Sequence, residues 1–175
     1  MRPERTPGFT IIELMIVMVI VGVMVSLAAP SMRDLIIRTR LKTAASDLHQ
    51  SLMQARSEAI KRNGVVQVVP NSGTNWALGW SVKEQAGGAV LSTQDAYQNV
   101  NFRTANAAYA TVSPLVAITF SGTGRETGSA NAGVAVVISA PDYPTIKARC
   151  VVIDPSGRAA VRQDRDFDSV TNGCN

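Results

Sequence analysis

Apolar side chains are concentrated near the N-terminus of this chain and become sparser after it. Residues 9–29 are nearly all apolar, and the acidic residue Glu13 lies within them. A helix of about 20 such residues is long enough to cross a bilayer core of about 30 Å. The pattern therefore predicts a transmembrane helix over residues 9–30, with Gly22 and Pro30 as points where the helix is weakened and flexible.

After Pro30 the apolar positions recur at the three- and four-residue steps of an amphipathic helix. The stripe that they form consists of Leu41, Ala44, Ala45, Leu48, Leu52, Ala55 and Ala59. Asn63-Gly64 is a typical helix end. The pattern predicts an amphipathic stem helix over residues 31–63, with one apolar face for packing.

From Gly64 the sequence changes to short β-type runs separated by residues that favour turns. The predicted strands are Val65–Val69, Trp76–Lys83, Ala89–Leu91, Val100–Phe102, Val116–Phe120, Val134–Ser139, Ala148–Ile153 and Arg158–Val161. The fold class is therefore α+β: a long N-terminal helix, partly transmembrane, packs on an antiparallel β-sheet or sandwich head over residues 64–175.

The formal net charge of +4 is carried by the stem. Residues 31–63 hold seven basic and three acidic side chains, whereas residues 64–175 hold eight of each. A basic stem suits contact with anionic lipid headgroups or with acidic neighbours.

Two cysteines, Cys150 and Cys174, lie near the C-terminus. An even pair in this position suits a disulfide in an oxidising compartment such as the periplasm. Two buried free thiols are the alternative.

Three interpretations of the N-terminal segment are open, and they differ in how well they account for Glu13. The segment is a secretory signal cut near Ala28, a plain signal anchor, or a helix released by cleavage after Gly8. A carboxylate in an apolar span is costly and usually has a partner. Cleavage after Gly8 would free an amine on Phe9, which can pair with Glu13 of a neighbouring chain, and this favours the third interpretation.

The run Gly8-Phe9-Thr10-Ile11-Ile12-Glu13-Leu14 resembles the cleavage and methylation motif of type IV prepilins and pseudopilins. The resemblance implies that residues 1–8 are a leader peptide and that a prepilin peptidase cuts before Phe9 and N-methylates it. It also implies that Glu13 aids filament assembly, that the chain is a single-pass protein of the inner membrane, and that its head lies in the periplasm.

The rest of the chain resembles the GspH/FimT group of minor pilins and pseudopilins. The resemblance rests on residues 55–63, 76–80, 120–125, 150–153 and 157–158. It implies a pilin-like fold and assembly with other pilin or pseudopilin subunits, in one of two settings. The chain initiates or caps a type IV pilus, or it is the H pseudopilin of a type II secretion system.

No enzyme signature is present, and no cofactor or metal is expected. The only histidine, His49, lies in the stem, where a solvated or packing role explains it better than catalysis does. Gly122-Thr123-Gly124 lacks the Lys-Ser/Thr ending of a phosphate loop. Asp164, Asp166 and Asp168 alternate, but the Gly and the final Glu of a calcium loop are missing.

DNA binding is a further alternative. Some FimT-like pilins carry a Gly-Arg-x-Arg element that is associated with DNA uptake, and residues 157–162 depart from its spacing by two residues. The candidate DNA-binding residues are Arg158, Arg162, Arg149, Lys147 and Arg165. Nearby aspartates almost cancel their charge, and no aromatic platform accompanies them.

Overall fold

The computed structural model describes residues 8–106, 115–128 and 133–164, without the side chains of residues 27–31, 105 and 106. Helix α1 covers Ile11–Arg62, 52 residues, and continues through Gly22 and Pro30 without interruption. Flexibility at those two residues stays a prediction. The chain divides into two compact units, Met1–Ile36 and Ile37–Asn175, and each is described by itself.

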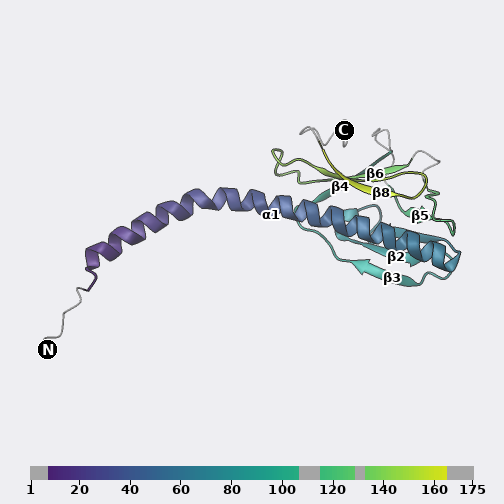
Figure 1. Ribbon diagram of the computed structural model, residues 1–175, viewed down its shortest axis with the longest axis horizontal. Coiled ribbons are helices and arrows are strands. Elements are labelled where there is room, and N and C mark those ends of the chain that lie inside the picture. The colour runs from purple at the N-terminus through teal and green to yellow at the C-terminus, as the bar shows by residue number, and fades with distance from the viewer. Residues whose placement is uncertain (1–7, 107–114, 129–132, 165–175) are drawn as a thin grey trace, which may run out of the picture. The chain divides into compact units, whose positions relative to one another are not determined.

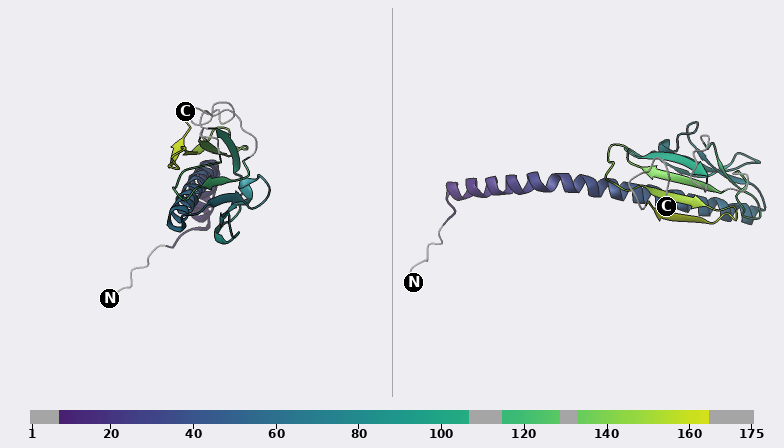
Figure 2. Two further views of the ribbon diagram at one scale, coloured as in Figure 1. Left: turned by 90° about the vertical axis from the view of Figure 1, so that its right-hand side faces the viewer. Right: turned by 90° about the horizontal axis from the view of Figure 1, so that it is seen from above.

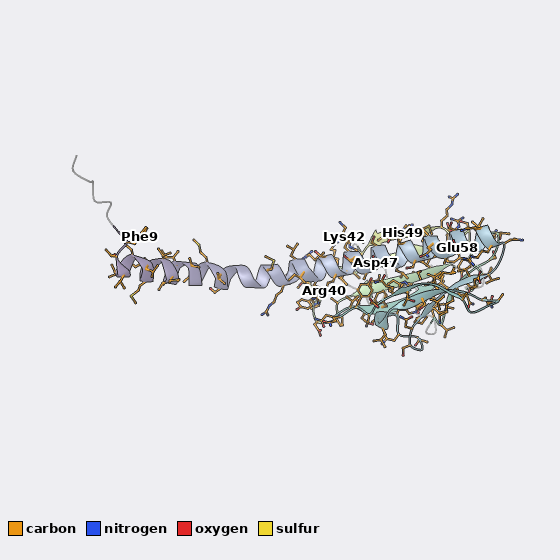
Figure 3. All side chains as sticks on the ribbon, turned by 90° about the horizontal axis from the view of Figure 1, so that it is seen from below. Phe9, Arg40, Lys42, Asp47, His49 and Glu58 are labelled. Carbon is orange, nitrogen blue, oxygen red and sulfur yellow. The ribbon has the colours of Figure 1, made fainter. Side chains whose placement is uncertain are left out.

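The first unit contains the N-terminal part of α1. All side chains from Gly8 to Ser26 are exposed. In Figure 3 they project from the helix from Phe9 onward. Among the residues described, no helix is both long and apolar enough to cross a membrane. The transmembrane helix over residues 9–30 stays a prediction.

The end of α1 lies where the sequence predicts it. Asn63 adopts a left-handed backbone with φ of 47°. The N–H of Gly64 then donates to the carbonyl of Ala59 at 3.1 Å, and the N–H of Asn63 donates to Ile60 at 3.2 Å. These bonds satisfy carbonyls that a helix end otherwise leaves without partners, so the helix stops here and the chain turns back.

Two four-stranded sheets make up the head, and all their strand pairs are antiparallel. Sheet A has the order β3-β2-β1-β5, and sheet B has the order β4-β6-β7-β8. The strands are β1 Val66–Pro70, β2 Trp80–Glu84, β3 Val90–Gln94, β4 Asn101–Asn106, β5 Ile118–Phe120, β6 Val134–Ser139, β7 Arg149–Ile153 and β8 Ala159–Gln163.

The predicted strand Trp76–Lys83 is wrong in its first part. Residues Trp76–Leu78 form a 3-10 helix, η1, and β2 begins only at Trp80. The side chain of Asn75 caps η1 by accepting a hydrogen bond from the N–H of Ala77 at 3.0 Å. This local bond gives the backbone an alternative to sheet pairing, which an apolar run alone does not reveal.

The predicted apolar stripe of α1 is confirmed as the centre of the head. Each of its seven side chains is at most 1% exposed. They form one core with inward-facing residues of both sheets, such as Val68 and Trp80 from sheet A and Val136 and Val151 from sheet B. In Figure 1, β2 and β3 of sheet A lie on one side of the helix, and β4, β6 and β8 of sheet B lie on the other. Both sheets remain alongside the helix in Figure 2.

Trp80 joins the helix to both sheets. Its indole N–H donates to the hydroxyl of Ser51 at 2.9 Å, and its ring stacks on Tyr97 with centroids 5.7 Å apart. It also meets Phe102 of sheet B edge-on at 5.7 Å. Tyr97 in turn donates to the carboxylate of Asp47 at 2.5 Å, and burial together with this bond raises the pKa of Tyr97. The aromatic cluster thus fixes the helix against the strands.

Ser51→Ala should destabilise the head, because it leaves the buried indole N–H of Trp80 without an acceptor. The expected loss in free energy of unfolding is about 1–3 kcal/mol. Ser57→Ala, at an exposed position of the same helix, is the matched control and should change stability little. Urea unfolding followed by far-UV circular dichroism measures both, and equal losses would show that the indole bond is not the cause.

Candidate functional site

The N-terminal end of α1 is closed by a capping box formed by Thr10 and Glu13. The Thr10 hydroxyl accepts from the N–H of Glu13 at 3.3 Å. The Glu13 carboxylate oxygen Oε2 accepts from the N–H of Thr10 at 2.9 Å and from its hydroxyl at 3.0 Å. This reciprocal pattern satisfies N–H groups that begin a helix. The sequence carries the signal Thr-x-x-Glu of this cap at residues 10–13, although the capping box was not predicted from it.

Both bonds reach the same carboxylate oxygen of Glu13. The second oxygen, Oε1, takes no part in the cap, and the side chain is exposed. A carboxylate accepts several hydrogen bonds at once. Glu13 is therefore able to hold its own helix end and still accept a charged donor from outside.

The helix that follows this cap is covered with exposed apolar side chains. Phe9 is 88% exposed and Ile11 is 82% exposed, and the remaining exposed residues of this kind include Ile12, Leu14, Met15, Ile16, Val17, Met18, Val19, Ile20, Val21, Val23, Met24 and Val25. Continuous apolar surface on a helix is typical of a segment that packs against other helices or against lipid.

Only one of the two cysteines of the predicted disulfide lies within the described residues. Cys150 in β7 is fully buried, and it packs with Val137 and Ala148 in a small cluster. Cys174 lies outside the described residues. A Cys150–Cys174 disulfide therefore stays a prediction.

The structure separates the basic residues that the sequence groups for DNA binding. Arg149 pairs with Gln163, and Arg162 pairs with Cys150 across β7 and β8. Because neighbouring strand positions face opposite sides, Arg149 and Arg162 lie on different faces of sheet B. Arg158 is exposed in the turn before β8, and Arg165 lies outside the described residues. The strand register therefore keeps Arg149 and Arg162 apart.

Arg56 forms a junction between the helix and two turns of the head. Its Nε donates to the carbonyl of Gly124 at 3.0 Å, and its Nη2 donates to the carbonyl of Ser156 at 3.2 Å. Gly124 belongs to the turn after β5, where its N–H donates to Ser121 at 2.7 Å. Ser156 belongs to the turn between β7 and β8. One guanidinium group thus ties sheet A, sheet B and α1 together.

Glycines make this junction possible. Gly157 has φ of +80°, and a Cβ there would lie 2.0 Å from the carbonyl oxygen of Gly124. Gly124 has φ of +75°, and a Cβ there would lie 2.6 Å from Cδ1 of Ile60. The backbone conformation disfavours other residues at both positions. At Gly157 the close approach to backbone leaves no room for a side chain. The sequence shows these glycines as ordinary turn residues, and no local signal indicates that the two turns touch.

Other candidates have structural roles. His49 is half-buried, and its Nε2 lies 3.2 Å from the carbonyl oxygen of Ala159. Asp164 is buried, while Asp166 and Asp168 lie outside the described residues. Within residues 8–106, 115–128 and 133–164, no group of three His, Cys, Asp or Glu side chains is placed to hold a metal ion.

Gly157→Ala should lower stability more than Gly88→Ala. Gly88 also has positive φ, at +65°, but nothing lies within 4 Å of its would-be Cβ. A left-handed alanine costs roughly 1–2 kcal/mol at either position, and only at Gly157 does the clash with Gly124 add to it. Thermal unfolding of both variants measures the difference. Equal losses would contradict a tight contact between the two turns.

Comparisons with known proteins agree with this architecture. Residues 5–29 match the family model of the prokaryotic N-terminal methylation motif, and residues 44–157 match that of type II transport protein GspH. Two curated fimbrial proteins of Pseudomonas aeruginosa are 31% identical over 74 residues, which is 42% of this chain and 48% of theirs. The chain thus spans about half the length of the curated relatives it matches.

Among solved structures, the type IV minor pilin FimU of Pseudomonas aeruginosa matches with a TM-score of 0.58 and 20% identity. The match covers 77% of this chain and 99% of FimU. The minor pseudopilin EpsH of Vibrio cholerae matches with a TM-score of 0.53 and 11% identity, over 71% of this chain and 97% of EpsH. These likenesses confirm the pilin fold. The GspH match exceeds half of the chain, so the protein belongs to the GspH family within the type IV pilin and pseudopilin superfamily.

Proposed function

We propose that this protein is a minor pilin that initiates or caps a type IV pilus. The observation that carries the proposal is the exposed apolar surface of α1 from Phe9 to Val25. A surface of this kind needs partners. Helices of other pilin subunits supply them in a filament, and the lipid of the inner membrane supplies them before assembly, with the head in the periplasm.

Processing at the N-terminus prepares this surface for assembly. The match of residues 5–29 to the methylation motif supports cleavage between Gly8 and Phe9 and methylation of Phe9 by a prepilin peptidase. Cleavage leaves a cationic amine one residue before the capping box. In apolar surroundings that amine needs a counter-charge, and Oε1 of Glu13 in a neighbouring subunit meets this need.

The pilus is preferred to a secretion system because the similarity to FimU is greater than that to EpsH in both TM-score and identity. The fimbrial relatives support the same choice. A role as the H pseudopilin of type II secretion is the second candidate, and the family name favours it. DNA binding stays a prediction, and the separation of Arg149 from Arg162 gives it no support.

Substitutions of Glu13 and Thr10 separate the two roles of the carboxylate. Glu13→Gln keeps an oxygen that can cap the helix but removes the charge, whereas Thr10→Ala keeps the charge and removes the hydroxyl. Losing one partner of a charge pair in apolar surroundings costs about 3–5 kcal/mol. Glu13→Gln and Glu13→Ala should therefore both abolish incorporation into sheared pili, measured by immunoblot, while Thr10→Ala should reduce it only modestly. Normal incorporation of Glu13→Gln would refute the charge pairing.

The mature N-terminus gives an independent test of processing. Mass spectrometry of the protein isolated from its native membrane should show N-methylated Phe9 as the first residue. Gly8→Val should block cleavage, because the peptidase would meet a branched side chain at the cut site. An uncut chain in assembled filaments would contradict the proposal.

A further inference from the structure

A polar hollow in the second unit lies between α1 and the outer strand of sheet A. Its volume is about 350 Å³. It is lined by Asp47, Gln50, Ser51 and Gln54 of α1, by Trp80 of β2, and by Ser92, Thr93 and Gln94 of β3. Seven of these eight side chains carry a carboxylate, amide or hydroxyl group, so the wall of the hollow is rich in hydrogen-bonding groups.

The register of sheet A explains why β3 turns polar side chains toward the helix. β3 is the outermost strand of this sheet, next to β2. Gln94 pairs with Trp80, and two residues earlier Ser92 pairs with Val82. Directly opposed residues of antiparallel strands project from the same face. Because Trp80 and Val82 are buried in the core, Gln94 and Ser92 project from the core-facing side of β3, where they meet the flank of α1.

Hydrogen bonds already orient two of the groups that α1 contributes. The hydroxyl of Ser92 donates to Oε1 of Gln54 at 2.9 Å and joins the strand to the helix. The hydroxyl of Tyr97 donates to Oδ2 of Asp47. The amide nitrogen of Gln54 and Oδ1 of Asp47 take no part in these two bonds and have further capacity. Groups that are held in place before binding lose less side-chain entropy when a ligand arrives.

We propose that this hollow binds a sugar unit, a ligand whose ring carries several neighbouring hydroxyl groups. A hydroxyl both donates and accepts hydrogen bonds, and a glutamine amide offers an acceptor beside two donors. Gln50 and Gln54 are neighbours on the helix surface, one turn apart, so they present two such amides to one ring. The carboxylate of Asp47 accepts from a further hydroxyl.

The size and the construction of the hollow suit a compact ligand. Ligand pockets in proteins span about 300–1,000 Å³, so a hollow of about 350 Å³ lies at the lower end of that range and fits a small ligand such as a single sugar ring. Its hydrogen-bonding groups come from side chains of the helix and of the inner face of β3. An added peptide strand would instead use the backbone edge of the outer strand.

Saturation-transfer-difference NMR of the full chain tests the proposal. The chain is kept in an amine-oxide detergent, because maltoside and glucoside detergents carry sugars that would compete. The probes are N-acetylglucosamine and glucose, with a short peptide of serine and threonine as the probe without a sugar ring.

Removing the two amides should weaken sugar binding. Loss of one hydrogen bond between neutral groups lowers affinity about fivefold, so Gln50→Ala/Gln54→Ala should lose roughly 25-fold. Both positions are exposed on a helix, where alanine is favourable. Gln85→Ala/Gln98→Ala removes two exposed glutamines that do not line the hollow, and this control should bind as the parent does.

Binding of either sugar that is weakened in Gln50→Ala/Gln54→Ala and kept in the control supports the proposal. A preference for N-acetylglucosamine identifies a site for acetamido sugars, a preference for glucose identifies a site for plain hexoses, and equal binding identifies a site that contacts only the hydroxyls that both share. Equal effects of the two double variants, or no transfer to either sugar, would overturn the proposal. So would binding of the peptide without binding of either sugar.

Circular dichroism of each variant checks its folding. If Gln50→Ala/Gln54→Ala is unfolded, Gln50→Phe replaces it, because this variant leaves the bond between Ser92 and Gln54 intact and obstructs the hollow with a ring. It should also lose sugar binding, and unchanged binding would contradict the proposal. None of these measurements requires filament assembly or cleavage after Gly8, so their outcome is independent of the Glu13 experiments.

Discussion

Burial of one face of α1 between the two sheets is the constraint on which the head depends. Neither sheet is closed, and each needs its inner face covered. The alanines at positions 44, 45, 55 and 59 are fully buried. Small side chains on a helix allow close approach of neighbouring backbone. Larger residues there would push the sheets outward and separate Trp80 from Phe102, which now touch across the two sheets.

Because the head depends on this packing, side chains at several successive turns of α1 form hydrogen bonds to the rest of the head. Asp47 and Ser51 hold the aromatic cluster, His49 reaches the carbonyl of Ala159, and Arg56 holds two turns. These polar groups flank the apolar stripe and meet strands of both sheets. Packing supplies most of the stability, and the flanking bonds fix the register of the helix against the strands.

Periodic features of this fold could be predicted from the sequence, because a helix face or a buried strand repeats at a fixed spacing. The stripe from Leu41 to Ala59 and the strand Val134–Ser139 are examples. The 3-10 helix at Trp76 was not predicted, since a single side-chain bond from Asn75 overrides the apolar pattern. Arg56 forms hydrogen bonds to two residues that lie 68 and 100 positions further along the chain. A local sequence pattern does not indicate contacts over such separations. The face on which each basic residue of sheet B lies depends on strand register, which the sequence does not show either.

The position of Arg56 has a mechanical consequence. It lies in the last two turns of α1, beyond the apolar stripe's midpoint, and it holds turns of both sheets. A force applied to the N-terminal side of α1 along its axis would have to move the whole apolar stripe relative to both sheets. Only then would the two hydrogen bonds of Arg56 break. Many contacts would then yield together in shear and not one after another.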